Sequence, residues 1–248
     1  MNFWLPVWAL WKRELVRFWR EKSRVMGFVG SPLIFWFVIG SGFGNLEFFF
    51  PGALTMTVMF SAIFSTMSLI EDRREGFLLS MLVSPAPRAS MVLGKVLGST
   101  TLAWIQGMIF LAFALFTNIP LSPMTILMTA GALFLVSFTF TVLGFLIAWQ
   151  MDSSQGFHAV MMLVLFPLWM VSGALFPEEK AHGWMKFIMK INPMTYGLAA
   201  LRQVLEPVVP VGTPGLELSL AVTAVCGFVL LMASARVAGS RSARDTTV

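Results

Sequence analysis

The chain has 248 residues, of which 57% are hydrophobic and only 12% are charged, and its mean hydropathy is +0.81. A soluble domain carries about 25% charged residues, so this composition excludes an ordinary soluble enzyme. Apolar runs of about 20 residues recur, and each could cross a bilayer core of about 30 Å. The runs are continuous rather than alternating. The sequence therefore predicts an all-α polytopic membrane protein.

The formal net charge of +5 does not indicate a nucleic-acid partner. In a membrane protein the distribution of Lys and Arg along the chain matters more than their sum. Cys226 is the single cysteine and lies in an apolar run, so an internal disulfide is impossible. It fits a small packing residue.

Residues 1–24 are predicted to form an amphipathic helix in the membrane interface. One face carries Trp8, Trp11, Leu15, Phe18 and Trp19. The opposite face carries Arg13, Arg17, Arg20 and Arg24, and is expected to point to water. No cleavable hydrophobic region is present, so this segment is not predicted to be a signal peptide. A solvated basic arm is the alternative.

Six spans are expected, near residues 25–44, 50–70, 96–116, 124–149, 157–176 and 216–235. Pro167 predicts a kink in the fifth span. Gly94 and Gly98, at the entrance of the third, are a pair of small residues suited to close approach of another helix.

The stretch Ile70–Lys95 is the longest charged interruption between apolar segments. Helical spacing places a polar stripe on an otherwise apolar helix, made of Arg73, Gly76, Ser80 and Ser84. Pro85 and Pro87 end this predicted helix. A short helix of this kind between two spans suits contact with a partner. A solvated loop that reverses the chain is the alternative.

The basic residues predict the topology. Of the 17 Lys and Arg residues, all but Lys180, Lys186, Lys190 and Arg202 lie in segments that six spans would place on one side. We therefore expect both termini in the cytoplasm.

Residues 177–215 are too long for a turn and too apolar for a solvated loop. One amphipathic face carries Trp184, Phe187, Ile188 and Ile191, and Asn192-Pro193 ends that helix. A second amphipathic piece carries Leu198, Leu201 and Leu205. We expect two short helices that re-enter the outer leaflet, covered by protein. Two surface amphipathic helices are the alternative.

No arrangement of residues predicts a catalytic or metal site. The expected topology separates His158 from His182, and Gly94-Lys95 is followed by Val96 rather than by Ser or Thr of a nucleotide-binding loop. Uncharged polar side chains follow several spans: Thr57, Ser61, Ser65, Gln106, Ser137 and Thr141. They could line a path for an amphiphile, or form hydrogen bonds between helices.

With these features the chain resembles the transmembrane subunit of type-2 ABC exporters. The N-terminal amphipathic helix is one point of resemblance. The others are Glu71-Asp72-Arg73-Arg74-Glu75-Gly76-Phe77-Leu78 with Ser84-Pro85, Arg88 and Gly94-Lys95, then Ser172–Pro177, and Asn192-Pro193-Met194-Thr195-Tyr196 with Arg202. The family often has Thr where this chain has Phe77.

The resemblance implies one transmembrane domain in the cytoplasmic (inner) membrane. Its parts would be a connecting helix (1–24), spans one and two (25–70), a cytoplasmic coupling segment (71–95), spans three to five (96–176), an outer re-entrant segment (177–215), span six (216–236) and a tail (237–248). A second copy of the chain would complete the pathway. Each copy would bind a separate ATPase subunit, which would hold ATP and Mg²⁺, so no cofactor is expected in this chain.

The resemblance also assigns roles to residues. The ATPase-coupling residues would be Glu71, Arg73, Arg74, Glu75, Gly76, Phe77, Leu78, Ser84, Pro85 and Arg88. The connecting helix would use Trp8, Trp11, Arg13, Arg17, Trp19 and Arg20. The outer gate would be formed by Phe176, Pro177, Asn192, Pro193, Tyr196 and Arg202.

The expected function is ATP-driven export of an amphiphilic or lipid-linked substrate such as a glycan, a lipid or a drug. A partner-independent channel or secondary carrier is the alternative. The sparse charge within the predicted spans weighs against it.

Overall fold

The computed structural model describes residues 3–20, 22–206 and 208–240, and these residues form helices and loops without a strand. The helices are α1 (Trp4–Arg20), α2 (Lys22–Gly42), α3 (Leu46–Ser65), α4 (Ser68–Arg74), α5 (Phe77–Leu82), α6 (Arg88–Leu111), η1 (Ala112–Phe116), α7 (Pro123–Gln150), α8 (Ser154–Val160), η2 (Met161–Leu165), α9 (Phe166–Trp169), η3 (Met170–Ala174), η4 (Glu178–Lys180), α10 (Gly183–Ile191), α11 (Pro193–Leu205) and α12 (Leu216–Ser240).

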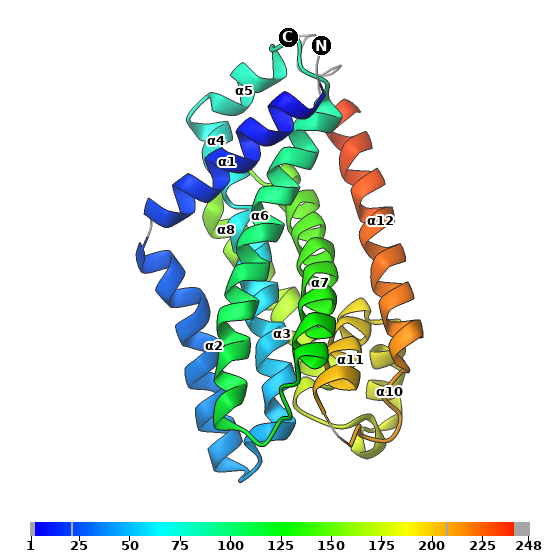
Figure 1. Ribbon diagram of the computed structural model, residues 1–248. Helices are drawn as coiled ribbons and strands as arrows, with labels where there is room; N and C mark the ends of the chain where they lie inside the picture. Colours follow the sequence, from blue (N-terminus) through cyan, green and yellow to red (C-terminus); the bar gives the residue numbers. More distant parts are fainter. Residues whose placement is uncertain (1–2, 21, 207, 241–248) are drawn as a thin grey trace.

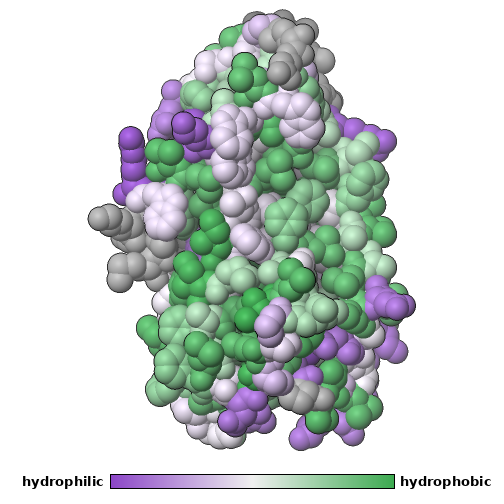
Figure 2. Space-filling view, in the orientation of Figure 1, coloured by the Kyte–Doolittle hydropathy of each residue, from purple (hydrophilic) through white to green (hydrophobic). Residues whose placement is uncertain are grey.

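The described residues contain five helical stretches that are long and apolar enough to cross a membrane. They are Leu46–Arg74, Arg88–Phe116, Pro123–Gln150, Ser154–Ala174 and Leu216–Ala238, and α2 adds the shorter apolar stretch Val29–Gly42. Figure 2 shows hydrophobic residues over most of the visible face. The predicted all-α polytopic fold is confirmed.

The helices form an elongated bundle with short helices at both ends (Figure 1). Helices α1, α4 and α5 lie at one end, and α10 and α11 lie at the other. The centre is α3, in which every residue from Phe49 to Ser65 is buried. Its neighbours are α2, α6 and α7. A helix that is apolar all round has no face for solvent, which explains this position.

Two predicted boundaries differ from the structure. The expected single helix after the second span is broken at Gly76, whose φ of +75° separates α4 from α5. This left-handed conformation is readily available only to glycine, so the chain turns there and the predicted continuous polar stripe does not form. The third membrane helix, α6, begins at Arg88 directly after Pro87, well before the expected start near Val96.

The fifth span is irregular at the expected place. Turns of π-helix, η2 and η3, lie on both sides of α9, which contains Pro167. Proline has no N–H to donate to the preceding turn, and wider turns are one way in which a helix accommodates it.

The close approach predicted at Gly94 and Gly98 is present, and the approaching element is α1. A Cβ atom on Gly94 would lie 2.9 Å from the carbonyl oxygen of Val7. A Cβ on Gly98 would lie 2.8 Å from the Cβ of Glu14. Because Gly94 and Gly98 of α6 have no side chains, the backbone of α1 can cross α6 in direct contact.

Candidate functional site

Buried charges meet where α1, α4 and α6 come together. Asp72 of α4 has no solvent exposure. Its carboxylate accepts hydrogen bonds from Arg13 Nη1 (3.0 Å), Arg13 Nη2 (2.6 Å) and Arg17 Nη1 (3.1 Å) of α1. The ammonium group of Lys95, on α6, also binds Asp72. One carboxylate thus connects three helices.

The same cluster contains a second buried carboxylate. Lys95 Nζ lies 2.7 Å from Glu14 Oε1 and 3.2 Å from the hydroxyl of Ser68. Arg17 Nη2 donates to Glu71 Oε2 at 2.6 Å. Three cations therefore meet three carboxylates. Buried charges persist only when paired in this way, because an unpaired charge in a low-dielectric interior is very costly.

The environment of Arg17 reflects this pairing. Partial burial disfavours its charged form, but the attraction of Glu71 and Asp72 outweighs that effect and raises the pKa of Arg17 above its usual value. Arg17 stays charged at any physiological pH, so this contact between α1 and α4 is not a pH switch.

The faces of α1 differ from those predicted. Arg13 and Arg17 were expected to point to water, but they bind the carboxylates of α4. The side of α1 against α6 buries Val7, Leu10, Glu14 and Phe18, so Phe18 does not belong to an exposed aromatic face. Trp8 and Trp19 are exposed, whereas Trp11 donates through Nε1 to Thr101 Oγ1 (3.1 Å). Arg13 and Arg17 turn toward the protein because α4 carries carboxylates that pair with them. The helical periodicity of α1 alone gives no sign of these partners.

Phe77, at the start of α5, belongs to the same junction. The guanidinium of Arg13 lies over its ring, 3.8 Å from the centroid. A cation over an aromatic face is attracted by the ring quadrupole. Phe77 therefore connects α5 to α1, a contact that a threonine could not make.

Arg73 and Arg74 hold α4 to the loop after α7. Arg73 donates to Asp152 Oδ1 (2.8 Å) and to the carbonyl oxygens of Met151 (2.8 Å) and Trp149 (2.6 Å). Arg74 reaches the carbonyl oxygen of Asp152 at 3.2 Å. Glu75 is exposed at the end of α4. The alternative of a freely solvated loop is therefore wrong for α4.

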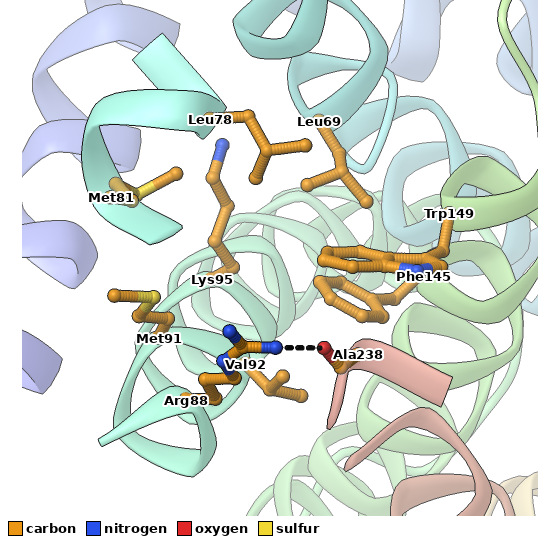
Figure 3. Close-up of a pocket in the computed structure, with 10 residues that line it drawn as sticks. All are labelled: Leu69, Leu78, Met81, Arg88, Met91, Val92, Lys95, Phe145, Trp149 and Ala238. Carbon is orange, nitrogen blue, oxygen red and sulfur yellow. Dashed lines mark hydrogen bonds between the residues drawn. The ribbon is translucent and has the colours of Figure 1, made fainter. Parts of the chain in front are cut away.

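Helix α5 rests on a small, mostly apolar pocket (Figure 3). Leu78 and Met81 of α5 line it, together with residues from α4, α6, α7 and α12. At its edge Arg88 Nη1 donates to the carbonyl oxygen of Ala238 (3.4 Å), connecting α6 with α12. Ser84 bonds back to Met81, and Pro85 is exposed in the turn that follows. Unlike α4, α5 is seated mainly by apolar contacts.

The uncharged polar residues of the spans are buried inside the chain. Ser61 Oγ donates to Gln106 Oε1 at 2.6 Å, joining α3 to α6. Thr57 and Ser65 bond to carbonyl oxygens one turn earlier in α3. Ser137 and Thr141 of α7 are buried, and within the described residues their hydroxyls have no hydrogen-bond partner. Hydrogen bonding between helices thus occurs at Ser61 and Gln106.

At the opposite end, α11 is almost fully buried against α3, α7 and α12. Asn192 caps it by accepting from Met194 N (3.0 Å), and its Nδ2 donates to the carbonyl oxygen of Leu168 (2.7 Å). Pro193 is the first helical residue, where its missing N–H costs nothing. Helix α11 is therefore not a surface helix.

The neighbouring α10 lies at the surface. Its predicted aromatic face is exposed through Trp184, Phe187 and Ile191. Tyr196 Oη donates to the carbonyl oxygen of Lys190 (2.8 Å), joining α11 to α10. Phe176 is exposed, and Pro177 precedes the short helix η4.

An ion pair at the end of α11 faces the start of α3. Arg202 and Glu206 are buried, with Arg202 Nε 3.5 Å from Glu206 Oε1. Arg202 also lies over the ring of Phe48 and donates through Nη2 to its carbonyl oxygen (3.3 Å). Burial raises the pKa of Glu206 to about 7, against the opposing attraction of Arg202.

Stability should therefore depend on pH through Glu206. The folded-state pKa lies above the ordinary value of 4.5, so folding favours the protonated form. This contribution is fully present below pH 4.5 and is lost as pH rises through about 7. After allowance for solvent screening, we expect this group to lower the free energy of unfolding by about 1–2 kcal/mol as the pH rises through this range. Glu206→Gln should abolish it.

The measurement is the free energy of unfolding in mild detergent at several pH values, for the wild type and Glu206→Gln in parallel. Every other titrating group is common to both chains and cancels in the difference. A difference that does not vary between pH 4.5 and 7 would contradict the assignment.

Sequence reasoning does not single out Glu14, Asp72 or Lys95 as site residues. Glu14 is an acid within a basic helix, and Lys95 lies two turns beyond Arg88 in an otherwise uncharged, apolar helix. Each is a signal for an oppositely charged partner, because an isolated charge on an apolar helix must be paired. The identity of the partners follows only from the packing of α1 on α6.

The sequence of this chain is similar to a family of known proteins. Residues 6–205 match the family model described as ABC-2 type transporter. The transport permease ycf38 of Cyanophora paradoxa is 28% identical over 210 residues, covering 79% of this chain and 72% of that protein. The daunorubicin resistance ABC transporter permease protein DrrB1 of Streptomyces coeruleorubidus is 25% identical, with 79% and 73% covered. Nodulation protein J of Rhizobium leguminosarum bv. trifolii is 23% identical, with 90% and 88% covered.

Proposed function

Because this chain belongs to the ABC-2 type transporter family as a transmembrane permease subunit, we propose that α5 binds a separate cytoplasmic ATPase subunit and that the complex is an exporter. ATP and Mg²⁺ would be held by that subunit. This chain would supply the translocation path and respond to the motion of its partner.

The observation that carries this proposal is the exposed apolar face of α5. Leu79 is 66% exposed and Val83, which directly follows α5, is 76% exposed, while Leu78 and Met81 on the other side are buried. Helix α5 lies at one end of the bundle (Figure 1). Large apolar side chains exposed beside one another on a seated helix suit a hydrophobic groove on a partner.

The contacts of α4 suggest how motion of α5 would reach the spans. Helix α4 follows α3 after a single turn at Thr66 and Met67. Its Asp72 binds α1 and α6, and its Arg73 binds the end of α7. A displacement of α5 by the partner would therefore be passed through α4 to α1, α3, α6 and α7, because elements joined by ion pairs tend to move as one rigid body.

We propose an amphiphilic or lipid-linked substrate. Two relatives are named for daunorubicin resistance and for nodulation. Thr57, Ser137 and Thr141 are buried within a single copy, so their hydroxyls would meet such a substrate only if α3 and α7 moved apart during transport. We further propose that α1, α4 and α5 face the cytoplasm of the inner membrane with both termini, because most Lys and Arg residues lie in those segments.

The test is an affinity pull-down of the full chain in mild detergent, with intact masses of the proteins recovered. The wild type should bring down an ATPase subunit in a two-to-two ratio. The double variant Leu79→Asp, Val83→Asp should lose it, because two carboxylates would have to be buried in the docking groove.

A matched control is available at the other end of the bundle. Val208 and Val211 are equally exposed apolar residues in the loop before α12, so Val208→Asp, Val211→Asp should retain the ATPase. Recovery of the wild-type chain alone, with transport by this chain in liposomes, would favour the partner-independent channel or carrier. ATPase recovery by the α5 variant would place docking elsewhere on this chain.

A further inference from the structure

A basic hollow lies on the side of α1, next to the junction with α4. It is wide and open to the outside. Its lining consists of Arg13, Val16, Arg17, Arg20 and Glu75. Three guanidinium groups and one carboxylate therefore face the same space, a composition suited to an anion.

Two of the three arginines are held in place. Arg13 and Arg17 are positioned from behind by Asp72 and Glu71. A guanidinium has five N–H donors, so groups held in this way still present donors to the hollow. Arg20, one turn beyond Arg17, is exposed at the open side. The hollow is thus partly preorganised, and Arg20 adds a cation that has no ion-pair partner among the described residues.

The hollow adjoins an exposed apolar face of α1. Trp8 is 60% exposed, and Trp19 and Val16 are also exposed. At 100° per residue these side chains lie on adjacent rows, and Val16 belongs to both the face and the lining of the hollow. Exposed tryptophans beside cationic residues are typical of a helix at the level of lipid headgroups.

We propose that this hollow binds the phosphate headgroup of an anionic phospholipid, with the acyl chains lying against the apolar face of α1. The arginines explain the preference for negative charge, and the adjoining tryptophans explain why the source is a lipid rather than a free phosphate. The proposal does not depend on ATP-driven export. Lipid bound there would hold α1 where Asp72 and Lys95 fasten it to α4 and α6.

The experiment uses the full chain purified in mild detergent and mixed with equal amounts of phosphatidylglycerol and phosphatidylcholine of identical acyl chains. Native mass spectrometry gives the ratio of the two lipids retained. The wild type should prefer phosphatidylglycerol. Arg20→Gln should lower that ratio about fivefold, the change expected for one basic residue at a membrane surface.

The control is Lys190→Gln, which removes an exposed cation from α10 at the other end of the bundle and should leave the ratio unchanged. Equal retention of both lipids by the wild type, or an unchanged ratio in Arg20→Gln, would overturn the proposal. Displacement of phosphatidylglycerol by millimolar inorganic phosphate would also overturn it, by showing an anion site indifferent to lipid. A protein partner recovered by the wild type but not by Arg20→Gln, without lipid preference, would assign the hollow to protein docking instead.

Discussion

Replacing Asp72 with Asn should destabilise the folded chain by about 3–5 kcal/mol, the cost of removing one partner of a buried ion pair. The substitution keeps the shape of the side chain but removes its negative charge. Lys95, which is only 4% exposed, would retain Glu14 but lose Asp72 as a charged partner, and Arg13 would lose a contact to both carboxylate oxygens. The measurement is the free energy of unfolding in detergent.

Two further variants separate charge from shape. Asp152→Asn also removes a carboxylate that binds an arginine, but Asp152 is 86% exposed, so the cost should stay below about 1 kcal/mol. Adding Lys95→Met to Asp72→Asn should not recover the loss, because Lys95 still pairs with Glu14 in the single variant and its removal would leave that buried carboxylate without the ammonium group. If Asp72→Asn costs no more than Asp152→Asn, the junction does not hold α1 to the bundle.

Replacing Gly98 with Val should destabilise the chain by about 1–3 kcal/mol through overpacking. The added Cβ would lie 2.8 Å from Glu14 Cβ and 3.0 Å from Glu14 Cγ. Neither atom can withdraw freely, because the carboxylate of Glu14 is fixed by Lys95. Helix α1 would have to move away from α6, which would strain the contacts at Asp72.

The matched control is Gly131→Val in α7. A Cβ on Gly131 would meet nothing within 4 Å, so this variant should change stability by no more than about 0.5 kcal/mol. Both substitutions place the same side chain in a long apolar helix, and they differ in the space available. Limited proteolysis near α1 reports whether α1 has moved away from α6. We expect faster cleavage there in Gly98→Val than in Gly131→Val. Equal stability of the two variants would mean that α1 does not need the close crossing.

The fold could be predicted from the sequence to the level of helices and their order. Long apolar runs leave few alternatives, because an unsatisfied backbone in lipid costs several kcal/mol per group, so they must be helical. Asn192-Pro193 marked the end of α10 correctly, since both residues act through local backbone chemistry. The start of α6 was harder to place, because its first turns carry charge and do not look like a span.

The candidate site was predicted only in part. Arg73, Arg74 and Phe77 were expected to belong to a coupling segment, and the structure places them in contacts that hold this segment to the bundle. Their partners, Trp149, Asp152 and Arg13, lie 64 or more residues away along the chain. Periodicity describes which residues share a face of one helix, and it carries no information about what that face meets.

By itself, then, the sequence determined that this chain is helical, spans a membrane and carries a charged segment between its second and third spans. These properties follow from local composition and from solvent, which act on each stretch independently. Tertiary structure alone decided that Gly94 and Gly98 admit α1, that Asp72 neutralises cations from two other helices, and that Arg202 lies against Phe48. The physical reason is that buried ion pairs and close packing each depend on two surfaces in contact. The sequence pattern of one helix describes only one of those surfaces.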